Sequence, residues 1–255
     1  MDPATLIGVI GALVFIVVAN VMEGGNPMSL MLIPPILLVV GGTIMISIAG
    51  GTLGDAKLAV SGMIKAFTGK ASNAGAVVPT LVSLADKARR EGLLALEDAL
   101  GDIDDPFLTK GLTLAIDGTD PEEVRDILEA EVVAMKAQTK QSAKFFTSAG
   151  AYAPTIGIIG TVMGLVHVLE NLAQPEELGH LIAGAFVATL WGVMSANVFF
   201  LPVGARIVRL GELEAAQMEI VIEGIAALQA GSNPRVVAQR LQSLLPADQR
   251  EQEAA

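Results

Sequence analysis

The sequence predicts an all-α membrane protein with four membrane-spanning helices, a helical cytoplasmic insert between spans 2 and 3, and a helical cytoplasmic tail. Hydrophobic residues make up 52% of the 255-residue chain, and the mean hydropathy of +0.59 is well above that of an ordinary soluble domain. Four stretches contain no Asp, Glu, Lys or Arg, and each is about 19 to 25 residues long, enough to cross a hydrocarbon core of ~30 Å as a helix. These stretches are Ala4–Met22, Met28–Gly51, Ser148–Leu169 and Leu181–Ala205.

The positions of the basic residues orient the spans. All 16 Lys and Arg residues lie in two blocks, Lys57–Lys144 and Arg206–Arg250, whereas the short loops Glu23–Pro27 and Asn171–His180 contain none. Because loops rich in Lys and Arg are retained in the cytoplasm, we expect both blocks to be cytoplasmic and both short loops to be periplasmic. An even number of spans also places both termini in the cytoplasm.

These features divide the chain into four segments. Spans 1 and 2 occupy residues 1–51, the cytoplasmic insert residues 52–145, spans 3 and 4 residues 146–205, and the cytoplasmic tail residues 206–255. Met1-Asp2-Pro3 places no cation before the first apolar run, and no convincing cleavage site follows it. We therefore expect the first helix to be retained rather than cleaved as a signal peptide.

Two strong helix starts lie in the insert, at Asp105-Pro106 and at Asp120-Pro121, where an Asp cap precedes a Pro at the first helical position. The second helix has no breaker before residue 150, so we expect it to run into span 3. In the tail, Arg206–Ala230 is predicted to extend span 4, and Asn233-Pro234 starts a short amphipathic helix through Leu245.

The four spans contain no carboxylate, and His167 alone among their side chains could exchange protons near neutral pH. If the protein moves protons through the bilayer, the acidic relay must therefore come from another chain. This absence argues against a self-contained pump and for a two-component device. A membrane scaffold that moves nothing is the alternative.

Small residues recur along spans 3 and 4 at helical spacing. Such stripes let helix backbones approach closely, which is how membrane helices associate. The two helices could pack on each other, or each stripe could face a second protein, and both can hold because each helix has its own stripe. The stripes are Ala153, Gly157, Gly160 and Gly164 in span 3, and Gly184, Ala188, Gly192 and Ala196 in span 4.

Pro154 and Pro202 lie inside these spans. Each leaves a carbonyl four residues earlier without its helical partner and favours a kink. Freed backbone at membrane depth is tolerated where it faces protein or a water-filled cavity, so the prolines indicate either an ion path or ordinary helix packing. Neutral polar groups on the same helices belong to Thr155, Thr161, Thr189 and Asn197.

Opposite charges occur on consecutive elements of the insert, at Lys87–Gly92 and at Glu97-Asp98. They form either a solvated face or an electrostatic docking surface, which favours fast and reversible contacts. The chain has no cysteine, no phosphate-binding or dinucleotide motif and no nucleophile–base pair, and His167 and His180 have no ligand partners at metal spacing. We therefore expect no enzyme activity, no cofactor and no metal, and the net charge of −11 argues against nucleic acid.

Four segments in order resemble the MotA-type flagellar stator proteins. Residues 151–165 (AYAPTIGIIGTVMGL) look like their third span, and residues 185–192 (AFVATLWG) with 197–202 (NVFFLP) like their fourth. Residues 87–97 (KARREGLLALE) resemble their insert motif, and residues 222–235 (IEGIAALQAGSNPR) their C-terminal signature. The resemblance covers essentially the whole chain, with Trp191 standing where the family usually has Tyr.

The resemblance implies a bacterial inner-membrane protein of which five copies surround two copies of a MotB-type partner. That partner would carry the missing membrane aspartate and anchor to peptidoglycan. Ions passing the aspartate would turn the ring against the rotor protein FliG and so drive flagellar rotation, motility and chemotaxis. In sodium-driven relatives the fourth span typically reads Thr-Thr where this chain has Ala188-Thr189, so the implied ion is the proton.

The resemblance also assigns roles to single residues. Its implied ion-path residues are Pro154, Thr155, Ala188 and Thr189; its coupling residue is Pro202; and its rotor-binding residues are Arg89, Arg90 and Glu97. The rival from another class is a TolQ/ExbB-type energiser of envelope transport. Those proteins have one span before the large cytoplasmic loop, whereas this sequence predicts two.

Overall fold

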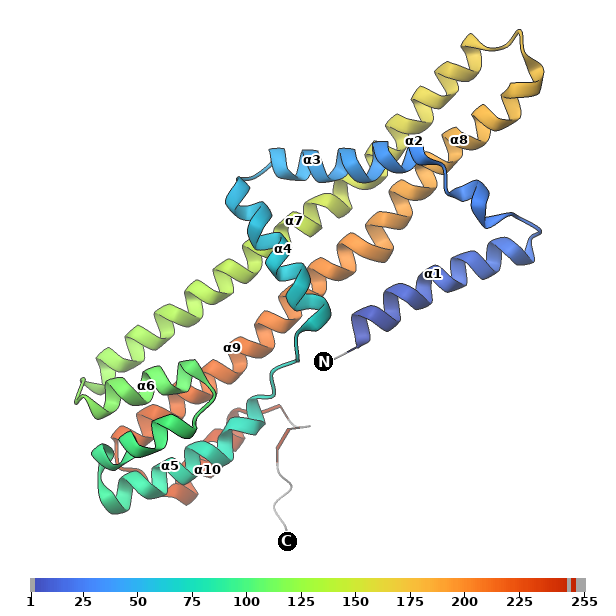
Figure 1. The fold of residues 1–255 in the computed structure, drawn as a ribbon. Helices are drawn as coiled ribbons and strands as arrows, with labels where there is room; N and C mark the ends of the chain where they lie inside the picture. The colour runs from blue at the N-terminus through green and yellow to red at the C-terminus, as the bar shows by residue number, and fades with distance from the viewer. Residues whose placement is uncertain (1–2, 247–248, 251–255) are drawn as a thin grey trace. The chain divides into compact units, whose positions relative to one another are not determined.

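The computed structural model describes residues 3–246 and 249–250, and every regular element among them is a helix (Figure 1). This confirms the all-α prediction. The chain divides into two compact units. Unit 1 comprises Met1–Lys70 and Gln138–Arg209, and unit 2 comprises Ala71–Ala137 and Leu210–Ala255.

Three helical segments in the described residues are long and apolar enough to cross a membrane: Ala4–Met22 (α1), Pro121–Glu170 (α7) and the unbroken helix Pro175–Gln229. The last combines α8 (Pro175–Met194), the π-helical turn η5 (Ser195–Phe200) and α9 (Leu201–Gln229). The predicted continuity of the helix from Pro121 into span 3, and of span 4 into the tail, is thus confirmed. No residue of α1 is buried, and most of its large apolar side chains are exposed.

The second predicted span, Met28–Gly51, is shorter as a helix than its sequence suggested. A separate 3₁₀ turn, η1 (Pro27–Leu30), comes first, and extended backbone at Leu32 ends it. The helix then runs over Ile33–Ala49 as α2 (Ile33–Ile36), the π-helical η2 (Leu37–Gly41) and α3 (Gly42–Ala49). The paired prolines at 34 and 35 are tolerated only in a first turn, so the helix starts there. Its 17 residues span about 25 Å at 1.5 Å per residue.

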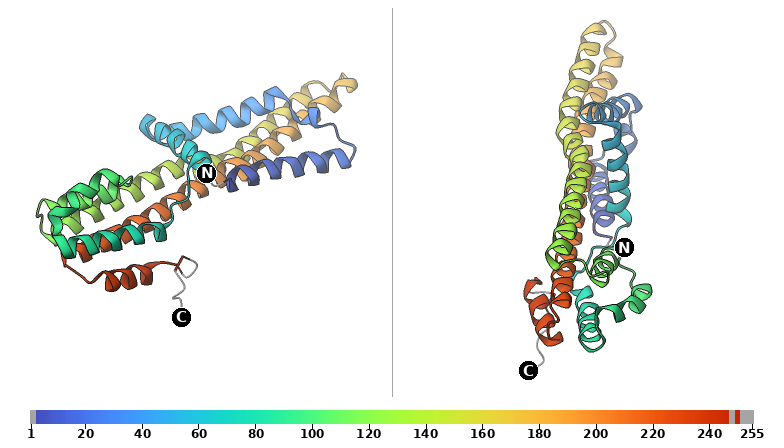
Figure 2. Two further views of the ribbon diagram at one scale, coloured as in Figure 1. Left: turned by 60° about the horizontal axis from the view of Figure 1, so that its bottom comes forward. Right: turned by 90° about the vertical axis from the view of Figure 1, so that its left-hand side faces the viewer.

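Helix α4 (Leu53–Thr68) follows within unit 1 and begins with a capping box. Thr52 accepts a hydrogen bond from the Asp55 N–H, and Asp55 accepts one from the Thr52 N–H at 2.8 Å. Its small buried residues lie against α7, where the Ser142 hydroxyl donates to the Leu58 carbonyl at 2.9 Å. Figure 2 gives two further views of these elements.

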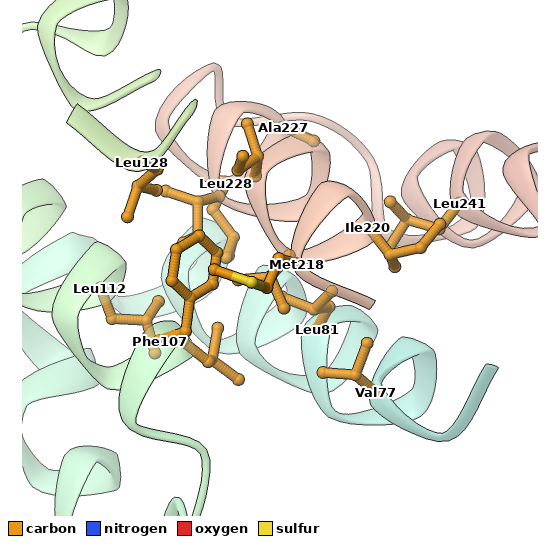
Figure 3. Packing of buried hydrophobic residues seen from close by; sticks show 14 of the residues in the cluster. Val77, Leu81, Phe107, Leu112, Leu128, Met218, Ile220, Ala227, Leu228 and Leu241 are labelled. Carbon is orange, nitrogen blue, oxygen red and sulfur yellow. The ribbon is translucent and has the colours of Figure 1, made fainter. Parts of the chain in front are cut away.

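Unit 2 is built around a core contributed by several helices (Figure 3). The helices are α5 (Val78–Glu91), α6 (Pro106–Ile116), α10 (Pro234–Leu244) and the parts of α7 and α9 that belong to this unit. Two 3₁₀ segments, η3 (Ala74–Val77) and η4 (Leu93–Asp102), flank α5. The most buried residues of this core are Leu81, Leu96, Leu108, Leu112, Val124, Leu128, Val221, Ile225, Val237 and Leu241, each at most 1% exposed.

Both predicted helix starts in the insert are confirmed. The Asp105 carboxylate accepts from the backbone N–H groups of Phe107 and Leu108, and Asp120 accepts from that of Glu122. A second oxygen of Asp105 accepts from the Gln217 amide at 2.9 Å, which joins α6 to α9. The same side chain therefore caps its own helix and also holds that helix against a distant one.

Candidate functional site

Helices α7 and α8 lie side by side in unit 1 and touch through their small residues (Figure 2). A Cβ added to Gly157 would lie 2.9 Å from the Ala188 carbonyl oxygen, and one added to Gly192 would lie 2.7 Å from that of Ala153. Gly160 and Gly164 meet the Ala188 and Ala185 methyl groups in the same way. Of the two roles predicted for the stripes, packing of the two helices on each other is therefore present in the structure.

This packing buries one of the predicted ion-path residues. Ala188 is 2% exposed, and its methyl group faces Gly160. Its neighbour Thr189 is half-buried, and its hydroxyl hydrogen-bonds that of Thr161. The Thr161 hydroxyl also lies 3.1 Å from the carbonyl oxygens of Gly157 and Ala185. The pair of hydroxyls is a polar link between α7 and α8.

Thr161 was not among the predicted site residues, although the sequence contained a signal for it. It directly follows Gly160 in the small stripe, as Thr189 directly follows Ala188. When the two stripes pack, this glycine and this alanine contact each other, and the threonines that follow them are brought close together. The sequence left open whether the two stripes pack on each other, so this contact between the threonines could be recognised only in the structure.

Pro154 and Thr155 occupy a different part of α7. Pro154 backs onto α8, since its Cα lies 3.3 Å from where a Gly192 Cβ would be. Thr155 is exposed, and its hydroxyl donates to the Tyr152 carbonyl at 2.7 Å. In the described residues no hydrogen bond joins Thr155 to Thr189, so the two threonines do not form one polar cluster within a single copy of the chain.

Pro202 lies two residues after the end of a π-helical turn. The turn η5 ends at Phe200, and Pro202 is the second residue of α9. The sequence predicted a kink at this proline, and the structure has a π-helical turn, in which the helix is locally wider. The Asn197 side chain within the turn donates to the Val193 carbonyl at 2.9 Å, so it satisfies backbone in its own helix.

Unit 1 exposes large apolar side chains along both helices. On α7, Ile158, Ile159, Val162 and Leu169 are each more than half exposed, and on α8 Phe186 is 63% exposed. The Trp191 indole N–H donates to the Leu30 carbonyl at 2.7 Å and ties α8 to η1. Exposed apolar surface of this kind is covered by lipid or by another chain in a membrane protein.

Both histidines line one apolar groove of about 370 Å³ between the Pro34–Pro35 turn, α7 and α8. His167 lies 3.5 Å from the Glu170 carboxylate. In residues 3–246 and 249–250 no group of three or more His, Cys, Asp or Glu side chains is arranged to hold a metal ion.

The predicted rotor-binding charges lie at the exposed end of α5 and at the start of η4. Gly92, with φ of +89°, ends α5 and turns the chain, so that Leu96 enters the core while Glu97 stays exposed. Arg90 is bound to Asp86 of its own helix at 2.5 Å. Arg89 is exposed and has no ion pair or hydrogen bond through its side chain in the described part of the chain.

A cluster of charges in unit 2 was not predicted from the sequence. The Glu223 carboxylate of α9 is 14% exposed and binds Arg125 of α7 at 2.8 Å and also Arg240 of α10. Arg125 additionally lies 3.5 Å from Glu129. The three helices meet at this carboxylate.

At the start of α4, the carboxylate of the capping box is electrostatically perturbed. The backbone hydrogen bond from Thr52 lowers the pKa of Asp55 below its ordinary value. A side-chain hydrogen bond from Gln141 and the positive charge of Lys144, both on α7, act in the same direction. Asp55 thus stabilises both the helix start and the contact of α4 with α7.

Comparison with known proteins identifies the family. Residues 99–220 match the MotA/TolQ/ExbB proton channel family. Motility protein A of Bacillus subtilis (strain 168) is 38% identical over 251 residues, which cover 98% of this chain and 93% of that protein. Chemotaxis protein PomA of Vibrio alginolyticus is 34% identical over 245 residues, 96% of each chain.

Two solved structures have the same fold over nearly the whole chain. The flagellar MotAB stator complex from Bacillus subtilis contains a chain that matches with a TM-score of 0.91 at 37% identity, covering 99% of this chain and 100% of that one. The C. jejuni MotAB structure matches with a TM-score of 0.94 at 29% identity and the same coverage.

The chain belongs to the MotA/TolQ/ExbB proton channel family, a group of membrane proteins that is not a known enzyme class. Within that family it is of the MotA stator type, since its full-length similarity is to motility proteins and to stator structures. The resemblance drawn from four sequence motifs is confirmed.

Proposed function

We propose that this chain is a flagellar motor stator subunit that, with a MotB-type partner, conducts protons across the bacterial inner membrane and converts the flow into torque on the rotor. The observation that carries the proposal is the 38% identity to a motility protein A over 98% of the chain. The absence of any carboxylate from the four apolar stretches supports it, because a proton path then needs an acidic group from a partner.

The partner in this proposal is a peptidoglycan-anchored MotB-type protein in two copies, surrounded by five copies of the chain in the lipid bilayer. Solved structures of relatives are described as MotAB complexes, which supports a MotB-type partner. The exposed apolar side chains of α7 and α8 supply surface for lipid, for the partner and for neighbouring copies.

We assign the ion path to Pro154, Thr155, Ala188 and Thr189, and coupling to Pro202. Thr155 offers an exposed hydroxyl on α7, and the Thr161–Thr189 pair places two more between α7 and α8. The side chain of Ala188 is a buried methyl group, which offers no oxygen ligand. A desolvated sodium ion needs several oxygen ligands, whereas a proton needs an acceptor and a hydrogen-bonded water path, so this lining favours the proton.

The rotor-facing surface in this proposal consists of Arg89, Arg90 and Glu97, which would contact FliG. All three side chains are exposed, as long-range docking charges require. Arg89 is the more available of the two arginines, because Arg90 is already paired with Asp86.

The proposed topology has four spans, with residues 52–145 and 206–255 and both termini in the cytoplasm. Residues 1–51 and 146–205 hold the spans. The basic residues support this orientation, since all 16 lie between Lys57 and Lys144 or between Arg206 and Arg250.

Deletion of the gene tests the function directly. Cells should lose swimming while keeping assembled filaments, because a stator drives rotation and is not part of the filament. A deletion strain that swims normally but fails in envelope transport would contradict the proposal and indicate a TolQ/ExbB-type energiser. Plasmid-borne wild-type gene is the control.

A further inference from the structure

The carboxylate of Glu223 is the point where three helices of unit 2 are joined by charge. It lies on α9, receives Arg125 from α7 at 2.8 Å, and is also paired with Arg240 from α10. Its side chain is only 14% exposed, whereas those of Arg125 and Arg240 are 40% and 55% exposed. The negative charge is therefore the buried member, and both guanidinium groups reach in to neutralise it.

Such a carboxylate depends on its partners. A mostly buried charge is costly unless it is paired, and guanidinium groups pair well with carboxylates because of their planar donor geometry. Removing one partner leaves the buried charge only partly compensated. The Arg240 contact is consequently a specific restraint on α10 rather than an interchangeable surface ion pair.

Helix α10 needs such a restraint because it is short. It has 11 residues, and isolated helices of that length are marginal in water. It is held by Val237 and Leu241, which are fully buried in the core, and by the pairing of Arg240 with Glu223 (Figure 3 shows Leu241 beside Ile220).

Helix α10 in turn packs on α5. Leu81, Leu84 and Ala85 of α5 lie in the same buried cluster as Val237 and Leu241. The last turn of α5 carries Arg89 and Arg90. The position of these arginines therefore depends on a helix that Glu223 holds in place.

We propose that Glu223 and Arg240 are positioning residues for torque transmission: they fix α10, and α10 holds the rotor-facing end of α5 in its working position. This proposal rests on the proposed function for the direction of its effect on torque. The structural part of the proposal is that the ion pair orders α5, and this part can be measured without a rotor.

The first experiment measures hydrogen–deuterium exchange of the purified complex co-expressed with its partner. Arg240→Gln should accelerate exchange of the amides in α10 and in the last two turns of α5 by about 5-fold or more, through easier local opening. The matched control is Arg235→Gln, because Arg235 is exposed on the same helix and its side chain forms no ion pair among the described residues. Faster exchange confined to α10, or equal in both variants, would overturn the proposal.

The second experiment measures motor torque at high load in two backgrounds. Arg240→Gln should lower torque about 2-fold or more in the wild-type background and cause little further loss in an Arg89→Gln background, because both changes act through the same contact. Arg240→Lys, which keeps the charge, should retain most of the torque. Equal losses in both backgrounds, together with a reduced amount of protein in the membrane, would show a purely structural role and overturn the proposal.

The two experiments separate this proposal from the proposed function. Unchanged torque in Arg89→Gln alone would contradict the rotor-facing role of α5 and, with it, the torque half of the proposal. Unchanged exchange of α5 in Arg240→Gln would overturn the positioning role while leaving the stator function intact.

Discussion

Gly157 of α7 and Gly192 of α8 face each other so closely that a Cβ on either would lie within 3.1 Å of the other's Cα atom. Backbone lies on both sides of this contact, and backbone cannot move aside as a flexible side chain can. The contact therefore sets how closely the two apolar helices approach.

Gly192→Ala should separate α7 from α8 and destabilise the complex by about 1–3 kcal/mol, as overpacking typically does. The added methyl carbon would lie 2.7 Å from the Ala153 carbonyl oxygen. Gly179→Ala is the matched control, because that glycine is on the same helix with no atom within 4 Å of the added carbon. Thermal unfolding in detergent measures the effect, and equal stability of the two variants would contradict it.

The coupling ion should be the proton, because the proposed ion path has a methyl group at Ala188 and lacks the oxygen that a threonine would supply there. Swimming speed should be independent of sodium at fixed pH and should collapse when a protonophore is added. Both are measured by tracking cells across a sodium series. Speed that follows sodium and survives the protonophore would show that the assignment is wrong.

Charge reversal at Arg89 should reduce motility more than charge reversal at Arg90, because Arg90 is held by Asp86 at 2.5 Å while Arg89 has no partner in the described residues. Membrane insertion should not change, since exposed charges contribute little to folding. Swimming in viscous medium and immunoblots of membranes are the measurements. A compensating reversal on the rotor should restore part of the loss for Arg89→Glu. Normal swimming of the Arg89→Glu strain under viscous load would exclude the docking role.

Asp55 should make the start of α4 sensitive to acid. Its pKa in the folded protein is lowered, chiefly by the hydrogen bond from the Thr52 N–H. The ionised form therefore stabilises the fold above the unfolded pKa of about 3.9, and this stabilisation is lost as pH falls through the lower folded pKa.

Asp55→Asn should remove that part of the acid dependence. Limited proteolysis between α3 and α4, followed from neutral pH to below pH 4, compares the variant with the wild type. Glu23→Gln is the control, because Glu23 is an exposed carboxylate of unit 1. An unchanged pH profile in Asp55→Asn would argue against the capping role.

Reporter fusions should define the topology. Fusions at residues 100 and 240 should report the cytoplasm, and a fusion at Gln174 should report the periplasm, because basic loops are retained inside. A periplasmic signal from residue 100 would exclude the four-span arrangement. The shorter helix Ile33–Ala49 makes this test informative for span 2 in particular.

The sequence by itself determined the helical class, the place of the apolar helices and the family. These depend on local properties: uncharged stretches, the Asp-Pro helix starts at 105 and 120, and contiguous motifs. The expected span 2 was too long, because an uncharged stretch was taken as one helix although the paired prolines at 34 and 35 allow a helix to start only there, after extended backbone at Leu32.

The tertiary structure alone decided which small residues face each other, that Ala188 is buried, and that Arg90 is paired while Arg89 is available. It alone brought Arg125 and Arg240 to Glu223, across a separation of 98 residues in the first case. Helical periodicity places a side chain on a face of its own helix, but it carries no information about which distant helix packs against that face. The contacts that position the candidate site depend on that packing, so they became visible only in the folded chain.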